Sequence, residues 1–186
     1  MKTKLHEIVM SMDFRGIRYD FNTVENQYML KFFDPLYVKR AINIVELLGL
    51  HKKKKMRIFD IGSGFAYFPY LCRELGHDVV ISDTQEPLYD AVTKYLGFEK
   101  ISLTVRAFEK MNMPGRFDCV TALKAAFHQK DDGDWGSVEW DFFYSDLREH
   151  LNPRAIVYIT GSNSMDPYHR SGDKQHLFNG GHWKIK

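Results

Sequence analysis

The residues best suited to hold a small charged ligand are two carboxylates that flank a pair of glycines. Asp60 lies in the short apolar stretch 58–61, and Gly62 and Gly64 follow it, while Asp83 follows a second apolar stretch at 79–81. Short apolar runs bounded by glycine predict buried strands. Glycine lets the backbone turn sharply and lets a ligand come close. An acidic residue at the position of Asp83 suits the two hydroxyls of an adenosine ribose.

A dinucleotide site fits these residues poorly. The pyrophosphate-binding pattern Gly-x-Gly-x-x-Gly needs a third glycine, and Tyr67 stands in its place. The carboxylate of Asp60 would also repel a pyrophosphate, whereas it would attract an ammonium group or ordered water. We therefore expect a nucleoside without phosphates and with a positively charged tail, and S-adenosylmethionine is such a molecule. The alternative, an ordinary glycine turn in which Asp60 caps the next helix, leaves Asp83 and the later order of elements unexplained.

In these residues the chain resembles the class I S-adenosylmethionine-dependent methyltransferases. Their first motif is a hydrophobic residue followed by Asp-x-Gly-x-Gly, with an acidic residue at the end of the second strand, and Asp60–Gly64 and Asp83 match it. The resemblance extends over about residues 34–160 and implies a methyltransferase with S-adenosylmethionine as cofactor. The cofactor-binding residues that it implies are Asp60, Gly62, Ser63, Gly64, Phe68, Asp83, Thr84, Ala107, Phe108, Leu123 and Lys124.

The chain departs from the family at two places. An Asp that the family often carries after the third strand is absent from 106–109, so adenine is expected to meet the backbone of Ala107 and the ring of Phe108. Relatives usually have Pro-Gly-Gly where this chain has Asn152-Pro153-Arg154. The second departure weakens the local match but keeps the order of helix and strand.

The catalytic candidate is His128, which lies just past the expected fourth strand. Methyl transfer is an in-line displacement at an activated sulfonium, so the protein mainly aligns the nucleophile. A base is needed only where the acceptor must lose a proton, and an imidazole titrates in the right range. The alternative is that His128 is a solvent-facing loop residue. Lys124 could instead act through its charge on an anionic acceptor.

The methyl acceptor is expected to be a small molecule. The segment 127–143, with Trp135 and Trp140, and Tyr67-Phe68-Pro69 are similar to a group of small bacterial methyltransferases that we associate with carbohydrate or other small-molecule modification. Trp135 is expected either to wall the acceptor site or to pack in the core. Two other functions remain open: an RNA methyltransferase that uses the lysine run 52–55, and a protein that binds the nucleoside without catalysis.

Composition places the chain among small globular proteins. Its 186 residues suit one domain, and the net charge of +2 is too small to argue for nucleic acid. No apolar run approaches the ~20 residues of a membrane span, and the N-terminus lacks the apolar core of a signal peptide. The two cysteines suit a reducing cytoplasm. The histidines and aspartates of the tail lack the spacing of zinc motifs, so no metal is expected.

The order of elements predicts a Rossmann-like α/β fold. Helices are expected at 35–48, 68–75 and 86–96, with a fourth whose apolar face runs from Trp140 to Leu151. Strands are expected at 58–61, 79–81, 101–105, 116–123 and 155–159. Alternating strands and helices form a parallel sheet with helices on both faces, and right-handed crossovers favour the strand order 3-2-1-4-5. The edge between the first and fourth strands is then the expected binding site.

The remaining segments are expected to flank this single domain. Residues 1–34 form either a sheet-edge cover or a lid, with Arg18, Tyr19 and Tyr28 as candidate pocket residues. Residues 35–160 form the core and 161–186 a tail. The antiparallel hairpin that the family adds after the fifth strand is expected to be reduced or absent, because the tail has room for at most a helical turn and one short strand. A homodimer could supply what is missing. His77, in the turn before the second strand, is expected at the surface.

Overall fold

The computed structural model describes residues 33–125, 127, 135–161, 176–179 and 182–185, the last two segments by backbone alone. Of the segment 1–34, expected as a sheet-edge cover or a lid, residues 1–32 lie outside the described part, and with them the candidates Arg18, Tyr19 and Tyr28. So does the catalytic candidate His128.

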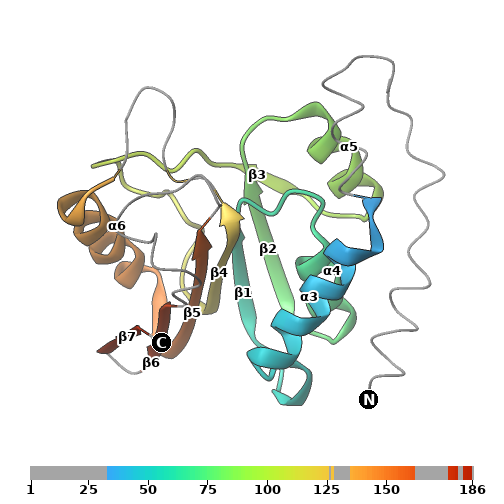
Figure 1. Ribbon diagram of the computed structural model, residues 1–186, viewed down its shortest axis with the longest axis horizontal. Helices are drawn as coiled ribbons and strands as arrows, with labels where there is room; N and C mark the ends of the chain where they lie inside the picture. Colours follow the sequence, from blue (N-terminus) through green and yellow to red (C-terminus); the bar gives the residue numbers. More distant parts are fainter. Residues whose placement is uncertain (1–32, 126, 128–134, 162–175, 180–181, 186) are drawn as a thin grey trace.

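The described strands form one sheet in the order β3-β2-β1-β4-β5-β6-β7. The first five are parallel, which confirms the predicted order 3-2-1-4-5. These strands are β1 (Arg57–Ile61), β2 (Asp78–Asp83), β3 (Lys100–Ser102), β4 (Phe117–Ala125) and β5 (Leu151–Gly161). From β1 the sheet extends through β2 to β3 on one side, and from β4 it extends to β5 on the other. Figure 1 shows the carboxyl ends of β1 and β4 at the same upper edge.

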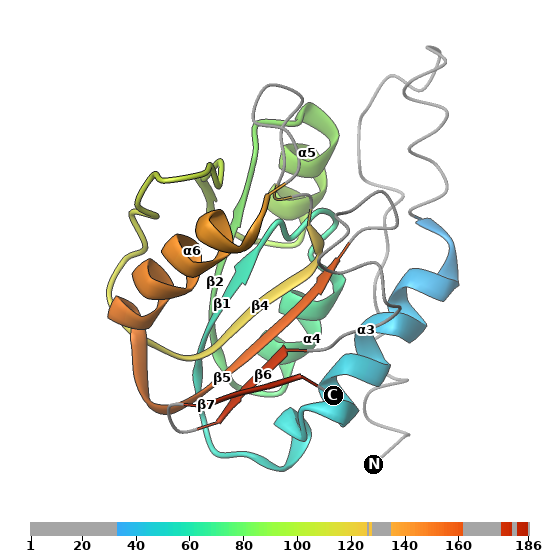
Figure 2. The same cartoon turned by 60° about the vertical axis from the view of Figure 1, so that its left-hand side comes forward.

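Helices cover both faces of the sheet, as predicted. They are α3 (Pro35–Leu47), α4 (Tyr67–Glu74), α5 (Pro87–Tyr95) and α6 (Ser137–Glu149), with a short 3-10 helix, η2 (Leu50–Lys52). Helices α3, α4 and α5 pack on one side, and α6 packs on the other (Figures 1 and 2). Each of α3 and α5 starts where the sequence indicates, because the carboxylates of Asp34 and Glu86 accept hydrogen bonds from the helix and a proline occupies the first turn.

Successive side chains of each strand point to opposite faces of the sheet, so the protein has two hydrophobic cores, one on each face. On β1, Ile58 packs with α3, α4 and α5, whereas its neighbour Phe59 packs with α6 and the irregular segment 103–116. That segment has no helix, and it is tied to α6 by a 2.7 Å hydrogen bond from the amide of Met111 to Asp146 Oδ2. Both faces of the central strands are therefore buried, as a parallel sheet requires.

The structure corrects the expected boundaries after the fourth strand. Leu151, expected on the helix, is the first residue of β5 and pairs with Phe117. A register irregularity then occupies 152–155, where Arg154 has a φ of 66°. The expectation of room for at most one short strand in the tail was wrong. A reduced hairpin of β6 (His176–Asn179) and β7 (His182–Ile185) pairs antiparallel to β5.

His77 is also corrected, because it is buried rather than at the surface. Its Nε2 lies 3.1 Å from the carbonyl oxygen of Leu50, and its Nδ1 accepts a 3.2 Å hydrogen bond from the amide of Met56. The imidazole therefore joins the segments that lead into β1 and β2. Among the described helices, none has both the length and the apolar character needed to cross a bilayer.

Candidate functional site

The glycine bend after β1 is held against the end of β2. The amides of Gly62 and Ser63 both donate to the carbonyl oxygen of Ser82, at 2.9 and 3.0 Å. Gly62 has a φ of 69°, and a Cβ there would meet the Cβ of Ala125 at 2.9 Å. Gly64 has a φ of 51°, yet a Cβ there would meet nothing within 4 Å. The first glycine is thus required for packing against β4, while the second borders open space.

Asp83 carries the hydrogen bonds that shape this bend. Its Oδ2 accepts a 2.6 Å bond from the amide of Gly64, and its Oδ1 accepts a 2.7 Å bond from the amide of Thr84. The Thr84 hydroxyl lies a longer 3.4 Å from Oδ1. A carboxylate offers about four lone pairs, so these contacts leave acceptor capacity on Oδ2 for a ligand hydroxyl. Burial raises the pKa of Asp83, and the hydrogen bonds from Gly64 and Thr84 act in the opposite direction.

Asp60 lies deeper, on β1 beside β4. It is 2% exposed, and its Oδ1 accepts a 2.5 Å hydrogen bond from the hydroxyl of Thr121. The hydroxyls of Ser63 and Ser82 donate to its backbone oxygen, at 3.0 and 3.2 Å. Burial raises the pKa of Asp60 to about 7, the Thr121 and Ser63 hydroxyls oppose that rise, and the charge of Asp83 adds to it.

The two carboxylates therefore form an electrostatic pair. Strands β1 and β2 are neighbours, and the residue before Asp83 is in register with Ile61, next to Asp60. Burial disfavours the charged form of both carboxyl groups, and the charge of Asp83 disfavours it further at Asp60. A positively charged group placed beside the pair would relieve both penalties, whereas a phosphate would increase them. The arrangement is suited to a cationic ligand.

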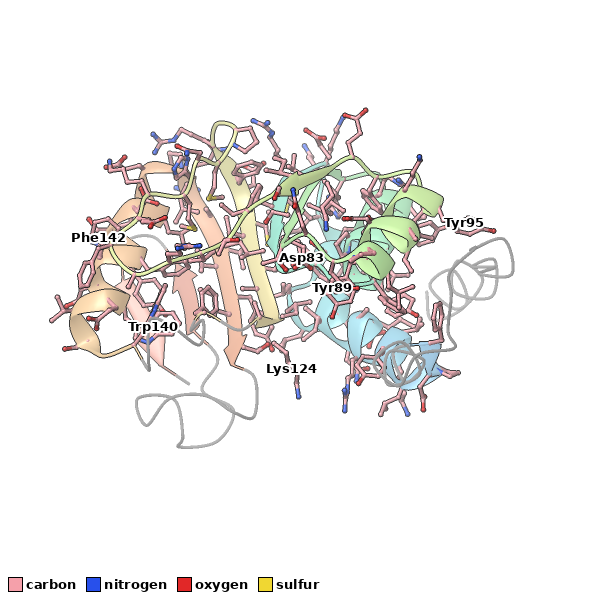
Figure 3. All side chains as sticks on the ribbon, turned by 90° about the horizontal axis from the view of Figure 1, so that it is seen from above. Asp83, Tyr89, Tyr95, Lys124, Trp140 and Phe142 are labelled. Atoms are coloured by element: carbon pink, nitrogen blue, oxygen red, sulfur yellow. The ribbon has the colours of Figure 1, made fainter. Side chains whose placement is uncertain are left out.

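The structure brings some of the other predicted cofactor residues to this edge. Thr84 is exposed and bonded to Asp83, and Lys124 is exposed at the carboxyl end of β4. Lys124 has a φ of 57°, and its amide donates a 2.9 Å hydrogen bond to Thr160 Oγ1. Figure 3, which looks onto this edge, shows Asp83 near the middle and the Lys124 side chain pointing outward. Leu123 is half-buried against the core, and Phe68 is fully packed on α4.

The two residues predicted to contact adenine, Ala107 and Phe108, pack toward α6. Phe108 is 54% exposed and has a φ of 60°, and its ring packs edge-on against Phe142 of α6 at 5.8 Å between centroids. Figure 3 shows Phe142 near α6, well to the side of Asp83. Ala107 is half-buried and packs with the core on the α6 side. An adenine contact by the Ala107 backbone or the Phe108 ring remains a prediction.

Trp135 packs in the core, which is the second of the two roles expected for it. It is 3% exposed and lies in a cluster of buried rings. The rings that contact it are those of Phe127, Trp140 and Phe143, at centroid distances of 5.1–6.0 Å. Its indole therefore stabilises the core beneath the segment that leads into α6.

The lysine run lies at the opposite end of the sheet from the glycine bend. Lys52–Lys55 are exposed and come just before Arg57, where β1 begins. The glycine bend follows the far end of that strand, and a strand of five residues spans about 17 Å. Within the described residues, no three His, Cys, Asp or Glu side chains come together as metal ligands.

Two residues at the site escaped sequence reasoning. Thr121 bonds to Asp60, and Lys100 bonds to the backbone oxygen of Thr84 at 2.7 Å. Thr121 has a weak sequence signal, because it is the one hydroxyl within the apolar run 119–123. Lys100 has none, since a lysine at the start of a short strand is ordinarily solvated.

Comparison with solved structures shows what the fold resembles. DesVI from Streptomyces venezuelae is 16% identical with a TM-score of 0.53, over 77% of this chain and 58% of that protein. A candidate O-methyltransferase from Nostoc punctiforme PCC 73102 is 12% identical with a TM-score of 0.53, over 85% of this chain and 48% of that protein. The chain thus spans about half of each of these proteins. No family model and no curated protein matches it. At these identities the likeness establishes the fold.

Proposed function

We propose that this chain binds S-adenosylmethionine and transfers its methyl group to an oxygen or nitrogen of a small molecule, with a saccharide as the leading class of acceptor. The observation that carries the proposal is the pair of buried carboxylates, Asp60 and Asp83, on either side of the glycine bend. The pair disfavours phosphate and favours a nucleoside with a cationic tail. The fold, shared with a candidate O-methyltransferase, is consistent with this activity.

The residues at the edge have the chemistry that the cofactor needs. Asp83 would accept hydrogen bonds from the ribose hydroxyls on the lone pairs that Gly64 and Thr84 leave available. Asp60 would face the cationic portion and become ionised beside it. Gly64 borders open space on the same bend, so a ligand can approach its backbone. When bound, the cofactor supplies a methyl group already activated by its sulfonium.

The protein's part in the transfer is then largely positional. Aligning the acceptor with the methyl group supplies most of what an in-line displacement needs. His128 is proposed as the base for acceptors that must lose a proton. Lys124, exposed at the same edge of the sheet, is proposed to contact the cofactor or an anionic acceptor through its charge.

The RNA alternative is less well supported than the small-molecule one. The lysine run that motivated it lies at the end of β1 remote from the glycine bend. An RNA bound there would have to reach around the sheet to present a base to the methyl group. Affinity for RNA that falls steeply with salt, together with RNA methylation, would reverse this preference.

Titration calorimetry with S-adenosylmethionine, S-adenosylhomocysteine and NAD tests the proposal directly. We expect both adenosyl ligands to bind and NAD to fail. Incorporation of labelled methyl groups into a panel of saccharides and small amines then separates an enzyme from a non-catalytic binder. Binding of NAD in preference to both adenosyl ligands would overturn the assignment.

A further inference from the structure

Lys100 is an almost fully buried cation next to the proposed nucleoside site. It is the first residue of β3, in register with Ile81 of β2, and its side chain is 8% exposed. Its ammonium forms an ion pair with Asp90 of α5 and donates a 2.7 Å hydrogen bond to the backbone oxygen of Thr84. A lysine side chain with so little exposure occurs in folded proteins only when an opposite charge or hydrogen-bond acceptors compensate its ammonium. One of these partners, Thr84, is also hydrogen-bonded to Asp83.

A continuous set of contacts leads from Lys100 to the glycine bend. The carbonyl of Thr84 accepts from Lys100, and the amide of the same residue donates to Asp83 Oδ1 at 2.7 Å. Asp83 Oδ2 in turn accepts from Gly64 at 2.6 Å. The ammonium therefore fixes the Thr84 residue that orients the Asp83 carboxylate, and it does so from a neighbouring strand and helix.

Lys100 is also the cation that acts on Asp83 through its charge. Burial raises the pKa of Asp83, and the positive charge of Lys100 lowers it. Two further charged groups are Asp60 on β1, whose own pKa is raised by the charge of Asp83, and Asp90 on α5, which is ion-paired with Lys100. The glycine bend contributes an amide hydrogen and no charge.

We propose that Lys100 is a positioning residue for the nucleoside site, where it keeps the Asp83 carboxylate ionised and oriented toward the ribose hydroxyls. The ligand part of this inference rests on the proposed function. The electrostatic part concerns the protein alone. Asp90 acts as a counterweight, because its negative charge reduces the effect of Lys100 on Asp83.

The first test measures the titration of Asp83 in the ligand-free protein by carboxyl carbon NMR, with the signal assigned by its loss in Asp83→Asn. In Lys100→Met the titration midpoint is expected to move to higher pH, because the cation is lost while the side-chain stem remains. In Asp90→Asn it is expected to move to lower pH, because Lys100 is no longer offset. Lys94→Met, at an exposed lysine of α5, is the matched control and should leave the midpoint in place.

Opposite shifts are the distinguishing result. A purely structural role for Lys100 would disturb Asp83 in the same direction in both variants, and an unmoved midpoint in Lys100→Met would overturn the proposal. If Lys100→Met fails to fold, Asp90→Asn still decides, since its substituted side chain is half exposed. A midpoint that does not fall in Asp90→Asn would then count against the inference.

The second test measures S-adenosylhomocysteine affinity across pH 6.5–9. The ratio of wild-type to Lys100→Met affinity is expected to be larger at the acidic end than at the alkaline end, because loss of the cation moves the titration of Asp83 to higher pH. The same ratio is measured in an Asp60→Asn background, because Asp60 titrates near pH 7 and is coupled to the charge of Asp83. A loss equal at every pH would overturn the electrostatic role. A wild-type protein that binds no adenosyl ligand would refute the proposed function. The NMR titrations would still test the electrostatic effect of Lys100 on Asp83.

Discussion

The Oδ2 atom of Asp83 accepts a 2.6 Å hydrogen bond from the backbone amide of Gly64, so the end of β2 directly holds the bend that follows β1. This side chain closes the glycine bend, and under the proposed function its remaining lone pairs would accept from the ribose hydroxyls. This dual role makes the carboxylate the most informative position in the site.

Asp83→Ala is expected to weaken S-adenosylmethionine binding by about 1.5–3 kcal/mol, the contribution of charge-assisted hydrogen bonds to a ribose. It also leaves the amides of Gly64 and Thr84 without their acceptor. Calorimetry measures the change in affinity. Asp78→Ala is the matched control, because Asp78 is an exposed carboxylate at the other end of β2 and should leave affinity unchanged. Equal affinity in wild type and Asp83→Ala would refute the ribose assignment.

The two glycines of the bend are expected to respond differently to alanine. Both have a positive φ, which disfavours alanine by about 1–2 kcal/mol, but only Gly62 lies against another side chain, the Cβ of Ala125 at 2.9 Å. Overpacking adds roughly 1–3 kcal/mol. Urea denaturation should therefore show Gly62→Ala to be the less stable variant.

Gly64→Ala is expected to change the affinity for the ligand rather than chiefly the stability of the protein. The alanine methyl group would project into the open space beside the bend, where the proposed cofactor lies. Gly64→Ala should reduce adenosyl-ligand affinity more than it reduces stability, and the comparison of calorimetry with urea denaturation measures this. If the two alanine variants had equal stability, the close approach of Gly62 to Ala125 would be wrong.

Sequence reasoning worked well where a local rule decides the structure. Helix α3 starts at Pro35 as expected, because capping by Asp34 and proline geometry depend only on adjacent residues. The strand order followed from the alternation of elements and the handedness of crossovers. The glycine bend and its two carboxylates followed from spacing.

Sequence reasoning failed where apolar spacing fits two structures. Leu151 lies four residues after Leu147, so it continues the apolar face of α6, yet the helix ends at Glu149 and Leu151 pairs in β5. The hairpin of β6 and β7 did have a signal, since two glycines stand between alternating runs in the sequence. The expectation of at most one short strand rested on the length of the tail and did not use that signal.

The contacts that tune the site could not be read from spacing at all. Lys100 reaches Thr84 across sixteen positions, and Thr121 reaches Asp60 across sixty-one. Such pairs form only once the sheet is assembled in register. The residues of the glycine bend are predictable from spacing, whereas those that set the charge of the neighbouring carboxylates are not.

Asp60→Asn is expected to stabilise the protein at alkaline pH while weakening cofactor binding. The pKa of Asp60 is raised to about 7 in the folded protein, chiefly by burial. The stability associated with this group is therefore fully present below the unfolded pKa of 3.8 and is lost as pH rises through about 7. The loss amounts to roughly 4 kcal/mol at most. Asparagine remains neutral and can still accept from Thr121.

Urea denaturation at pH 5 and pH 8.5 measures this difference. The stability gained by Asp60→Asn should be larger at pH 8.5, and calorimetry at the same pH should show weaker binding of the cationic ligand. Asp78→Asn removes an exposed carboxylate at the far end of β2, leaves the carboxyl group of Asp60 in place and serves as a control for the pH dependence. A gain that is the same at both pH values would contradict a neutral buried carboxyl in the free protein.

The protein is also expected to lose stability on acidification, because His77 becomes protonated. Burial lowers the pKa of His77 below 6.5, because the ring is desolvated, although the contact with Leu50 acts in the opposite direction. Nδ1 accepts from the amide of Met56, so a proton on Nδ1 would replace an acceptor with a donor. A histidine with a lowered folded pKa supports the fold fully above the unfolded value of 6.5, and that support is lost as pH falls toward the folded value.

His77→Gln tests this sign. The variant should be less stable at pH 8 by about 1–3 kcal/mol, because a buried hydrogen bond is lost, and its stability should depend less on pH between 7 and 5. His150→Gln is the matched control, since His150 lies in an exposed contact with the carbonyl of Gly115. If wild type and His77→Gln lost stability in parallel on acidification, the acid sensitivity would have to arise from groups other than this imidazole.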